Sequence, residues 1–234
     1  MGQTWEDLAF LHWPVSIDEL RAVVPPQLPI DTFDGRPWLG ITPFVVRGLR
    51  LRATPPLPVI SSFPELNVRT YVTLDGKPGI YFLSLDAASR VAVSGARLLY
   101  RLPYYAAKID VERVGERMHY RSRRRVAQSE SAELDAEYAP TGPIVLYPAG
   151  SLEHWLTERY CLYTFDERLE IQRADIHHPP LAASESARRP APQQHGAGRR
   201  NPPAWGPSRP LRAPPGRSDP VSYTHLTLPT TPYV

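Results

Sequence analysis

The sequence has little cysteine and lysine and no long apolar run. Cys161 is the only cysteine, so no disulfide can form within the chain, which is typical of a reducing cytoplasm. Lys77 and Lys108 are the only lysines among 27 basic residues. No apolar run reaches the roughly 18 residues of a membrane helix, and the first residues lack the basic start of a signal peptide. We therefore expect a cytoplasmic protein with no membrane segment.

The excess of positive charge comes from the end of the chain. The formal net charge is +3, from 27 basic and 24 acidic residues. Residues 181–234 contain seven arginines and two acids, which leaves 20 basic and 22 acidic residues in residues 1–180. Because this larger part is nearly neutral, the composition gives no support for a nucleic-acid partner.

Residues 181–234 also differ in composition from the rest. They hold 11 of the 28 prolines and show no apolar periodicity, which predicts disorder. Their Arg, Pro, Ala and Gly content is what GC-rich DNA gives in a shifted reading frame, and residues 221–231 resemble translated sequencing adapter. We expect a domain over residues 1–180 and a disordered, non-native tail over 181–234; a native basic tail is the alternative.

The pattern of apolar residues and turns predicts many short strands and few helices. Hairpins are expected at residues 28–46, 104–126 and 160–176, and further strands at 65–74, 80–85 and 134–138. Helices are expected after the capping box Ser16–Glu19, over 86–100 and over 151–159. The predicted fold class is α+β and β-dominated, a curled sheet or β-barrel with two or three flanking helices.

The central strand has two different faces. Alternation places Leu66, Val68, Thr70 and Val72 on one face and Glu65, Asn67, Arg69 and Tyr71 on the other. An acid, an amide, a cation and a phenol in one row can line a polar pocket. An ordinary solvated face is the alternative.

Several motifs carry a resemblance to a known family. They are residues 11–15, 24–26, 38–44, 63–72, 102–106 and 176–180. Over about residues 5–180 the chain resembles the YqjF-like family, domain of unknown function 2071, which is grouped with the acetoacetate decarboxylase-like fold. The resemblance implies a cone-like β-barrel with flanking helices, from which this chain would lack the last strands.

The resemblance implies a fold more than a reaction. Acetoacetate decarboxylase uses a Schiff-base lysine activated by a neighbouring cation, in a pattern of proline followed by two lysines. The matching segment here is Pro103-Tyr104-Tyr105, so no such lysine pair is present. Classical decarboxylation is therefore not expected.

Glu65 and Arg69 are the leading candidate site residues. By resemblance, Glu65 matches an acid that lines the decarboxylase-like pocket and would serve as acid or base, while Arg69 could hold a substrate carboxylate through two hydrogen bonds. Asn67, Tyr71 and Tyr104 are further ligand-binding candidates. The structural alternative is an internal ion pair between Glu65 and Arg69.

The remaining candidates are weaker. Lys108 shares a strand face with Asp110 and could act as base or nucleophile, although a surface ion pair is commoner. His177 and His178 are adjacent and point in opposite directions on a strand, so we expect no metal and no cofactor. The run Arg121–Arg125 is typical of a solvated face, with an anion-binding or nucleic-acid-binding surface as the alternative.

These observations favour one function and leave another open. We expect a small organic acid to bind in the barrel, with non-Schiff-base lyase or hydratase-type chemistry as an extension. The alternative is a ligand-binding or interaction module without enzymatic activity.

Overall fold

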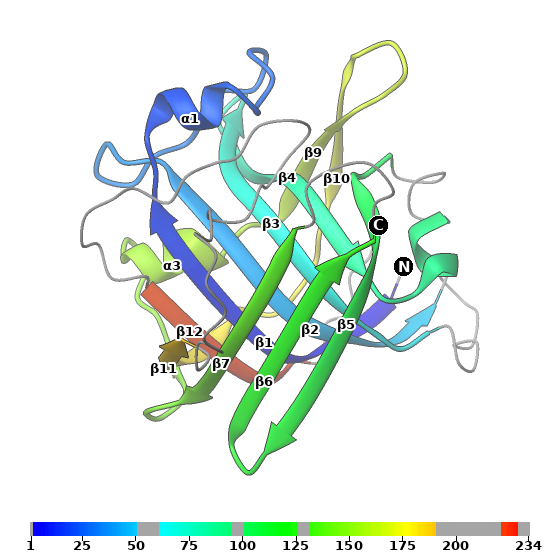
Figure 1. The fold of residues 1–234 in the computed structure, drawn as a ribbon. Helices are drawn as coiled ribbons and strands as arrows, with labels where there is room; N and C mark the ends of the chain where they lie inside the picture. Colours follow the sequence, from blue (N-terminus) through cyan, green and yellow to red (C-terminus); the bar gives the residue numbers. More distant parts are fainter. Residues whose placement is uncertain (1, 51–60, 95–100, 126–131, 191–220, 229–234) are drawn as a thin grey trace, which may run out of the picture.

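The fold is a strongly curled sheet with a few short helices (Figure 1). The computed structural model describes residues 2–50, 61–94, 101–125, 132–190 and 221–228. Its strands are β1 (Gly2–Pro14), β2 (Trp38–Arg50), β3 (Phe63–Leu74), β4 (Lys77–Ala87), β5 (Tyr104–Val114), β6 (Arg117–Arg124), β7 (Glu133–Pro140), β8 (Val145–Leu146), β9 (Cys161–Phe165), β10 (Ile171–Asp175), β11 (Ala182–Pro190) and β12 (Val221–Leu228). The helices are α1 (Ile17–Arg21) and α3 (Leu152–Thr157), and residues 90–94 are also helical.

The strand order shows how the sheet curls. Neighbouring strands follow the order β10-β9-β4-β3-β2-β1-β12-β11-β7-β6-β5, and β5 also pairs in parallel with β4. The path from β4 round to β5 therefore returns to β4, and Figure 1 shows β5, β6 and β7 lying across β1, β2 and β3. The prediction of a β-dominated α+β fold with a curled sheet is confirmed.

Most of the expected elements are present. The hairpin β5–β6 turns at Gly115, whose φ of 63° suits glycine, and β9–β10 forms the third expected hairpin. Ser16 and Glu19 form the expected capping box of α1. The hydroxyl of Ser151 caps α3 by accepting from the amide of His154. These short-range signals were sufficient because the contacts they predict are local.

Two expectations differ from the structure. Residues 28–33 do not pair with β2; they run beside the end of β3, where Asp31 donates its amide to the Tyr71 carbonyl at 2.9 Å. Helix 86–100 was expected to begin at Asp86, but β4 continues to Ala87 because Asp86 pairs with Leu66. Only residues 90–94 are helical, and residues 95–100 lie outside the described residues.

The structure places two strands in the segment for which the sequence predicts a disordered tail. β12 pairs with β1, and β11 pairs with β12, β7 and β8. Residues 221–228 include Val, Tyr, two Thr and two Leu, a composition that suits a strand, and their backbone pairs with the edge of β1. The domain boundary at residue 180 and the shifted reading frame beyond it stay predictions.

The two faces of β1–β4 pack against different layers. One face, with Leu66, Val68 and Val72 of β3, shares a core cluster with residues of α1 and of β5–β7. The other face carries two smaller clusters, to which α3 contributes Leu156. The alternation predicted for β3 is thereby confirmed, and its polar row lies on the face turned away from β5–β7.

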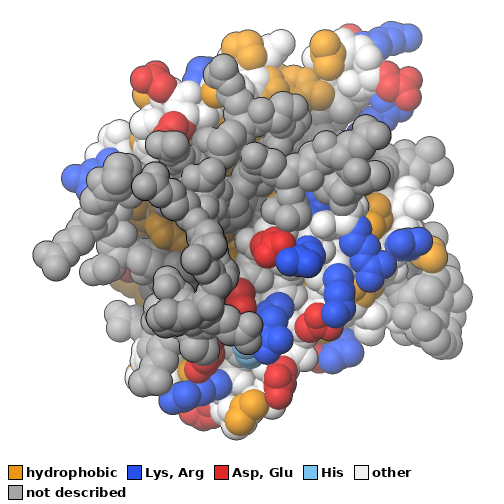
Figure 2. Space-filling model, viewed as in Figure 1, with side chains coloured by type: hydrophobic (Ala, Val, Ile, Leu, Met, Phe, Trp, Pro, Cys, Tyr) orange, Lys and Arg blue, Asp and Glu red, His pale blue; other side chains and the backbone are white. Residues whose placement is uncertain are grey.

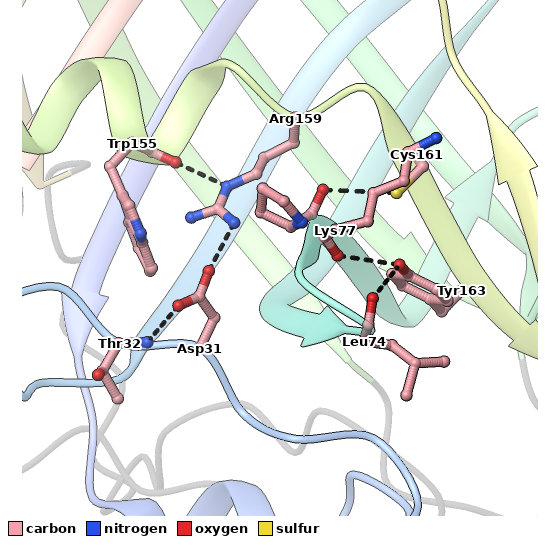
Figure 3. Close-up of polar contacts among 9 residues, drawn as sticks. Asp31, Thr32, Leu74, Lys77, Trp155, Arg159, Cys161 and Tyr163 are labelled. Atoms are coloured by element: carbon pink, nitrogen blue, oxygen red, sulfur yellow. Dashed lines mark hydrogen bonds and ion pairs between the residues drawn. The ribbon is translucent and has the colours of Figure 1, made fainter. Parts of the chain in front are cut away.

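A set of polar contacts fixes α3 and β9 to the sheet (Figure 3). Arg159 donates to the Trp155 carbonyl at 2.8 Å and pairs with Asp31 at 2.7 Å. Tyr163 of β9 donates to the Lys77 carbonyl at 2.9 Å. Arg159 and Asp31 are 128 residues apart in the sequence, so their ion pair joins the segment after α3 to the segment beside β3. The Leu156 carbonyl of α3 accepts from Arg69, which places α3 at the polar face of β3.

The outer surface of β5–β7 mixes both signs of charge, as Figure 2 shows for the side seen in Figure 1. Arg123 pairs with Glu133 at 2.7 Å and Arg117 pairs with Glu137 at 3.4 Å across neighbouring strands. Arg124, from the same run, is instead buried and pairs with Asp86 at 2.8 Å, with side-chain exposures of 6% and 1%. The basic run is thus divided between a solvated ladder and an internal ion pair.

The two adjacent arginines of β6 give a prediction about stability. Arg124→Ala leaves the Asp86 carboxylate buried without its cation, which should lower the free energy of unfolding by about 3–5 kcal/mol. Arg123→Ala is the matched control, because removing an exposed pair should cost about 1 kcal/mol or less. Urea denaturation of both variants measures the difference; equal losses would contradict the prediction.

Candidate functional site

A cavity of about 140 Å³ lies on the polar face of β3. Glu65, Asn67 and Arg69 line it, together with Thr42 of β2 and Tyr104 of β5. Most of its remaining wall is apolar and comes from β1, β2, β4, β9 and the segments beside β5 and β10. We expected a pocket inside the barrel, but the space between β1–β4 and β5–β7 is filled by the first core cluster. The cavity lies on the opposite face of β1–β4.

Arg69 is a buried cation without a carboxylate. It is 9% exposed, and among the described residues no acid lies within 4.0 Å of its guanidinium. One nitrogen, Nη2, donates to the Leu156 carbonyl of α3 at 3.2 Å, while Nε is buried without a hydrogen-bond partner in the described part of the chain. The expected alternative of a structural ion pair with Glu65 is not formed. A buried charge in this state is costly unless an anion joins it.

Aromatic rings and a glycine hold the Arg69 side chain in place. Its guanidinium carbon lies 5.1 Å from the ring centroid of Phe10 and 5.7 Å from that of Tyr71, which are cation–π distances. Gly40 of β2 pairs with both His12 and Arg69. A Cβ at this position would lie 3.1 Å from the His12 ring and 3.3 Å from Cγ of Arg69, so glycine leaves room for both side chains.

Glu65 lies in the same row and is a neutral acid at neutral pH. It is 5% exposed, and Tyr104 donates its hydroxyl toward both carboxyl oxygens, at 3.3 and 3.2 Å. Burial raises the pKa of Glu65 to about 8, against the opposing effect of hydrogen bonds from Tyr104 and Asn67. The same burial and the nearby Glu65 raise the pKa of Tyr104 well above its ordinary value. Glu65 can therefore give a proton to a bound molecule.

Two further polar atoms in the cavity wall are buried without a partner in the described structure, Oγ1 of Thr42 and Oδ1 of Asn67. Thr42 pairs directly with Asn67 across β2 and β3. Sequence reasoning missed Thr42, although the alternation of Trp38, Gly40, Thr42 and Phe44 places it on one strand face. The missing information was that β2 lies next to β3 with this register.

A bulge in β4 shapes the apolar wall. Val68 pairs with Ser84 and Arg69 pairs with Phe82, so Leu83 is an extra residue in β4. Leu83 therefore packs in the first core cluster, while Phe82 and Leu85 both line the cavity. Without the bulge, strict alternation would turn Phe82 away from Arg69.

Two of the expected site residues lie outside the cavity wall. Tyr71 is fully buried, and its hydroxyl lies 2.6 Å from Nε2 of His12. Its ring packs against the Arg69 guanidinium instead of lining the cavity. Burial and the nearby Arg69 lower the pKa of His12 well below its ordinary value, and the ring is neutral. Lys108 is exposed on β5 and pairs with Asp110 at 3.3 Å. This surface ion pair agrees with the commoner of the two interpretations made from the sequence, and not with a catalytic lysine.

In the described part of the chain, the site has no group of metal ligands and no amine that could form an imine. Among the described residues, no group of three or more His, Cys, Asp or Glu side chains could hold a metal ion. Neither of the two lysines lines the cavity, since Lys77 pairs with Asp175 at 2.7 Å at its edge. In the same part of the chain, no helix has both the length and the apolar character needed to cross a membrane.

Comparisons with known proteins agree with this architecture. The model of the family DUF2071, described as an uncharacterized conserved protein, matches residues 2–204. The chain belongs to this family. It is 47% identical over 180 residues to the uncharacterized protein YqjF of Bacillus subtilis (strain 168), a match that covers 77% of this chain and 73% of that protein. The family match extends beyond residue 180.

Similar solved structures share the fold. The enduracididine biosynthesis enzyme MppR complexed with pyruvate has a TM-score of 0.59 at 13% identity, covering 98% of this chain and 87% of that chain. Acetoacetate decarboxylase from Legionella pneumophila has a TM-score of 0.53 at 14% identity, covering 100% of this chain and 87% of that chain. The acetoacetate decarboxylase-like fold implied by the sequence is confirmed.

The raised pKa of Glu65 predicts a pH dependence of stability. The folded state keeps a proton on Glu65 up to about pH 8, whereas the unfolded chain loses it near 4.5. The free energy of unfolding should therefore fall as the pH rises from about 4.5 to about 8. In Glu65→Gln, the free energy of unfolding should no longer show this contribution to its fall with pH. Glu133→Gln on the exposed face of β7 is the control and should keep the wild-type pH dependence. Urea denaturation between pH 5 and pH 9 measures it; identical slopes for wild type and Glu65→Gln would contradict it.

Proposed function

We propose that the cavity binds a small organic acid whose carboxylate pairs with Arg69. The observation that supports this is the guanidinium itself, buried at the cavity wall with Nε unpartnered and no acid within ion-pair distance among the described residues. A bound carboxylate would supply both the missing charge and the missing acceptor. In the solved structure with pyruvate, the similar protein MppR holds a small carboxylate. That likeness is a likeness of fold, and the proposal rests on Arg69.

Proton transfer to the bound acid is a second candidate function, and Glu65 favours it. A carboxyl group with a pKa of about 8, hydrogen-bonded to Tyr104 at a cavity wall, is protonated at neutral pH and can act as a general acid. Such a group suits lyase or hydratase-type steps that protonate a carbon or an oxygen of the ligand. No lysine lines the cavity, so these steps proceed without an imine. A binding module would have the Arg69 contact alone.

Removal of the guanidinium tests the binding proposal. Arg69→Met keeps an apolar side chain of similar length, and it should weaken the binding of acetate, butanoate and hexanoate by roughly 10- to 150-fold, since hydrogen bonds to charged groups contribute about 1.5–3 kcal/mol. Arg47→Met is the control, because Arg47 lies on β2 and pairs with Glu6 outside the cavity. Isothermal titration calorimetry measures the affinities. Carboxylates that bind wild type and Arg69→Met equally would reject the proposal.

A further inference from the structure

We propose that the ligand is a monocarboxylic acid with an apolar body of about six carbon atoms, its carboxylate held by Thr42 and Arg69 together. This inference rests on the proposed function and names its substrate class. It also assigns to Thr42 the role of second carboxylate donor.

Thr42 and Arg69 form one donor group at the cavity wall. Thr42 lies opposite Asn67, and Arg69 follows Asn67 by two residues on the same face of β3, so the two side chains come from neighbouring positions on adjacent strands. Oγ1 of Thr42 and Nε of Arg69 are buried, and neither has a hydrogen-bond partner in the described structure. Because Thr42 is only 3% exposed, bulk water does not satisfy its hydroxyl. A carboxylate bound at this part of the wall would accept from the Thr42 hydroxyl and from the Arg69 guanidinium.

The other ionisable groups of the cavity argue against a second carboxylate on the ligand. Among the described residues, Arg69 is the only cation in the cavity wall, and the other side chains there that carry or can carry a charge at neutral pH are the acids Glu65 and Asp175. Asp175 already pairs with Lys77, whose ammonium group together with the hydrogen bond lowers its pKa. A second carboxylate would thus leave water without gaining a cation, and such a burial is strongly unfavourable.

The size and the lining of the cavity set the body of the ligand. An apolar cavity of about 150 Å³ accepts a benzene molecule, and this cavity measures about 140 Å³. Phe44, Phe82 and Leu85 are largely buried and line it, so the body of the ligand meets hydrocarbon. Acetate would fill only a small part of this space, and each further methylene that leaves water should strengthen binding about fourfold.

A set of four ligands tests the inference: hexanoate, adipate, acetate and hexan-1-ol. Isothermal titration calorimetry of the full chain at pH 7 should rank hexanoate first. Adipate has the same chain length with a second carboxylate and should bind at least about tenfold more weakly. Acetate lacks the body and hexan-1-ol lacks the charge, and both should bind more weakly than hexanoate.

Variants connect this ranking to the proposed residues. Thr42→Val keeps the shape of the side chain and should weaken hexanoate binding about tenfold, because it removes one hydrogen bond to a charged group. Hexan-1-ol binding should change little. Thr73→Val is the control, since Thr73 lies on β3 outside the cavity wall.

The outcomes separate the inference from the proposed function. The inference is overturned if adipate or acetate binds as tightly as hexanoate, or if Thr42→Val leaves the hexanoate affinity unchanged. The proposed function survives either result as long as carboxylate binding still depends on Arg69. If none of the three carboxylates binds in a manner that depends on Arg69, the proposed function fails and the inference fails with it.

Discussion

Strand β3 must bury both of its faces, and the rest of the structure follows from this constraint. Its apolar face can be covered by any well-packed hydrophobic layer, which α1 and β5–β7 supply. Its polar face carries an acid, an amide and a cation, which hydrophobic packing alone cannot satisfy. On that side the short helix α3 contacts Arg69 through the Leu156 carbonyl. The cavity lies on the same face, with Glu65, Asn67 and Arg69 in its wall.

The energetic consequence is that the site is partly satisfied before any ligand binds. Arg69 is surrounded by the rings of Phe10 and Tyr71, and it donates one hydrogen bond to α3. These contacts offset part of the cost of burying its charge. Glu65 avoids the same cost in another way, since its raised pKa keeps it neutral. Under the proposed function, this positive charge and this neutral acid on one strand face would contact different ends of a bound molecule.

Sequence reasoning found the parts of this site that depend on local pattern. Period-two alternation in β3 identified its two faces, and the turn and capping residues located the β5–β6 and β9–β10 hairpins and the two capped helices. The parts that it missed depend on contacts between strands. Thr42 enters the site through the register of β2 against β3, and Phe82 enters through the bulge at Leu83. Neither register nor bulge is encoded within a single strand.

The same distinction explains the differences elsewhere. Alternation places Tyr71 on the polar face of β3, but His12 and Trp155 from other elements pack against its side chain, which does not line the cavity. Residues 221–228 have a composition that suits a strand, yet only the edge of β1 determines that they form one. An edge strand pairs with a distant segment because its own backbone N–H and C=O groups lack hydrogen-bond partners.

By its resemblance to acetoacetate decarboxylase, the sequence has Tyr104 and Tyr105 where that pattern has two lysines, so we expect a different chemistry here. An amine in such a pocket forms a covalent imine and must be deprotonated first, which a neighbouring cation achieves by lowering its pKa. Tyr104 cannot form an imine, and its hydroxyl donates to Glu65. That carboxyl group is buried, and burial raises its pKa to about 8. The proposed function fits this arrangement, because Glu65 lies where it could protonate a bound acid and neither of the two lysines lines the cavity.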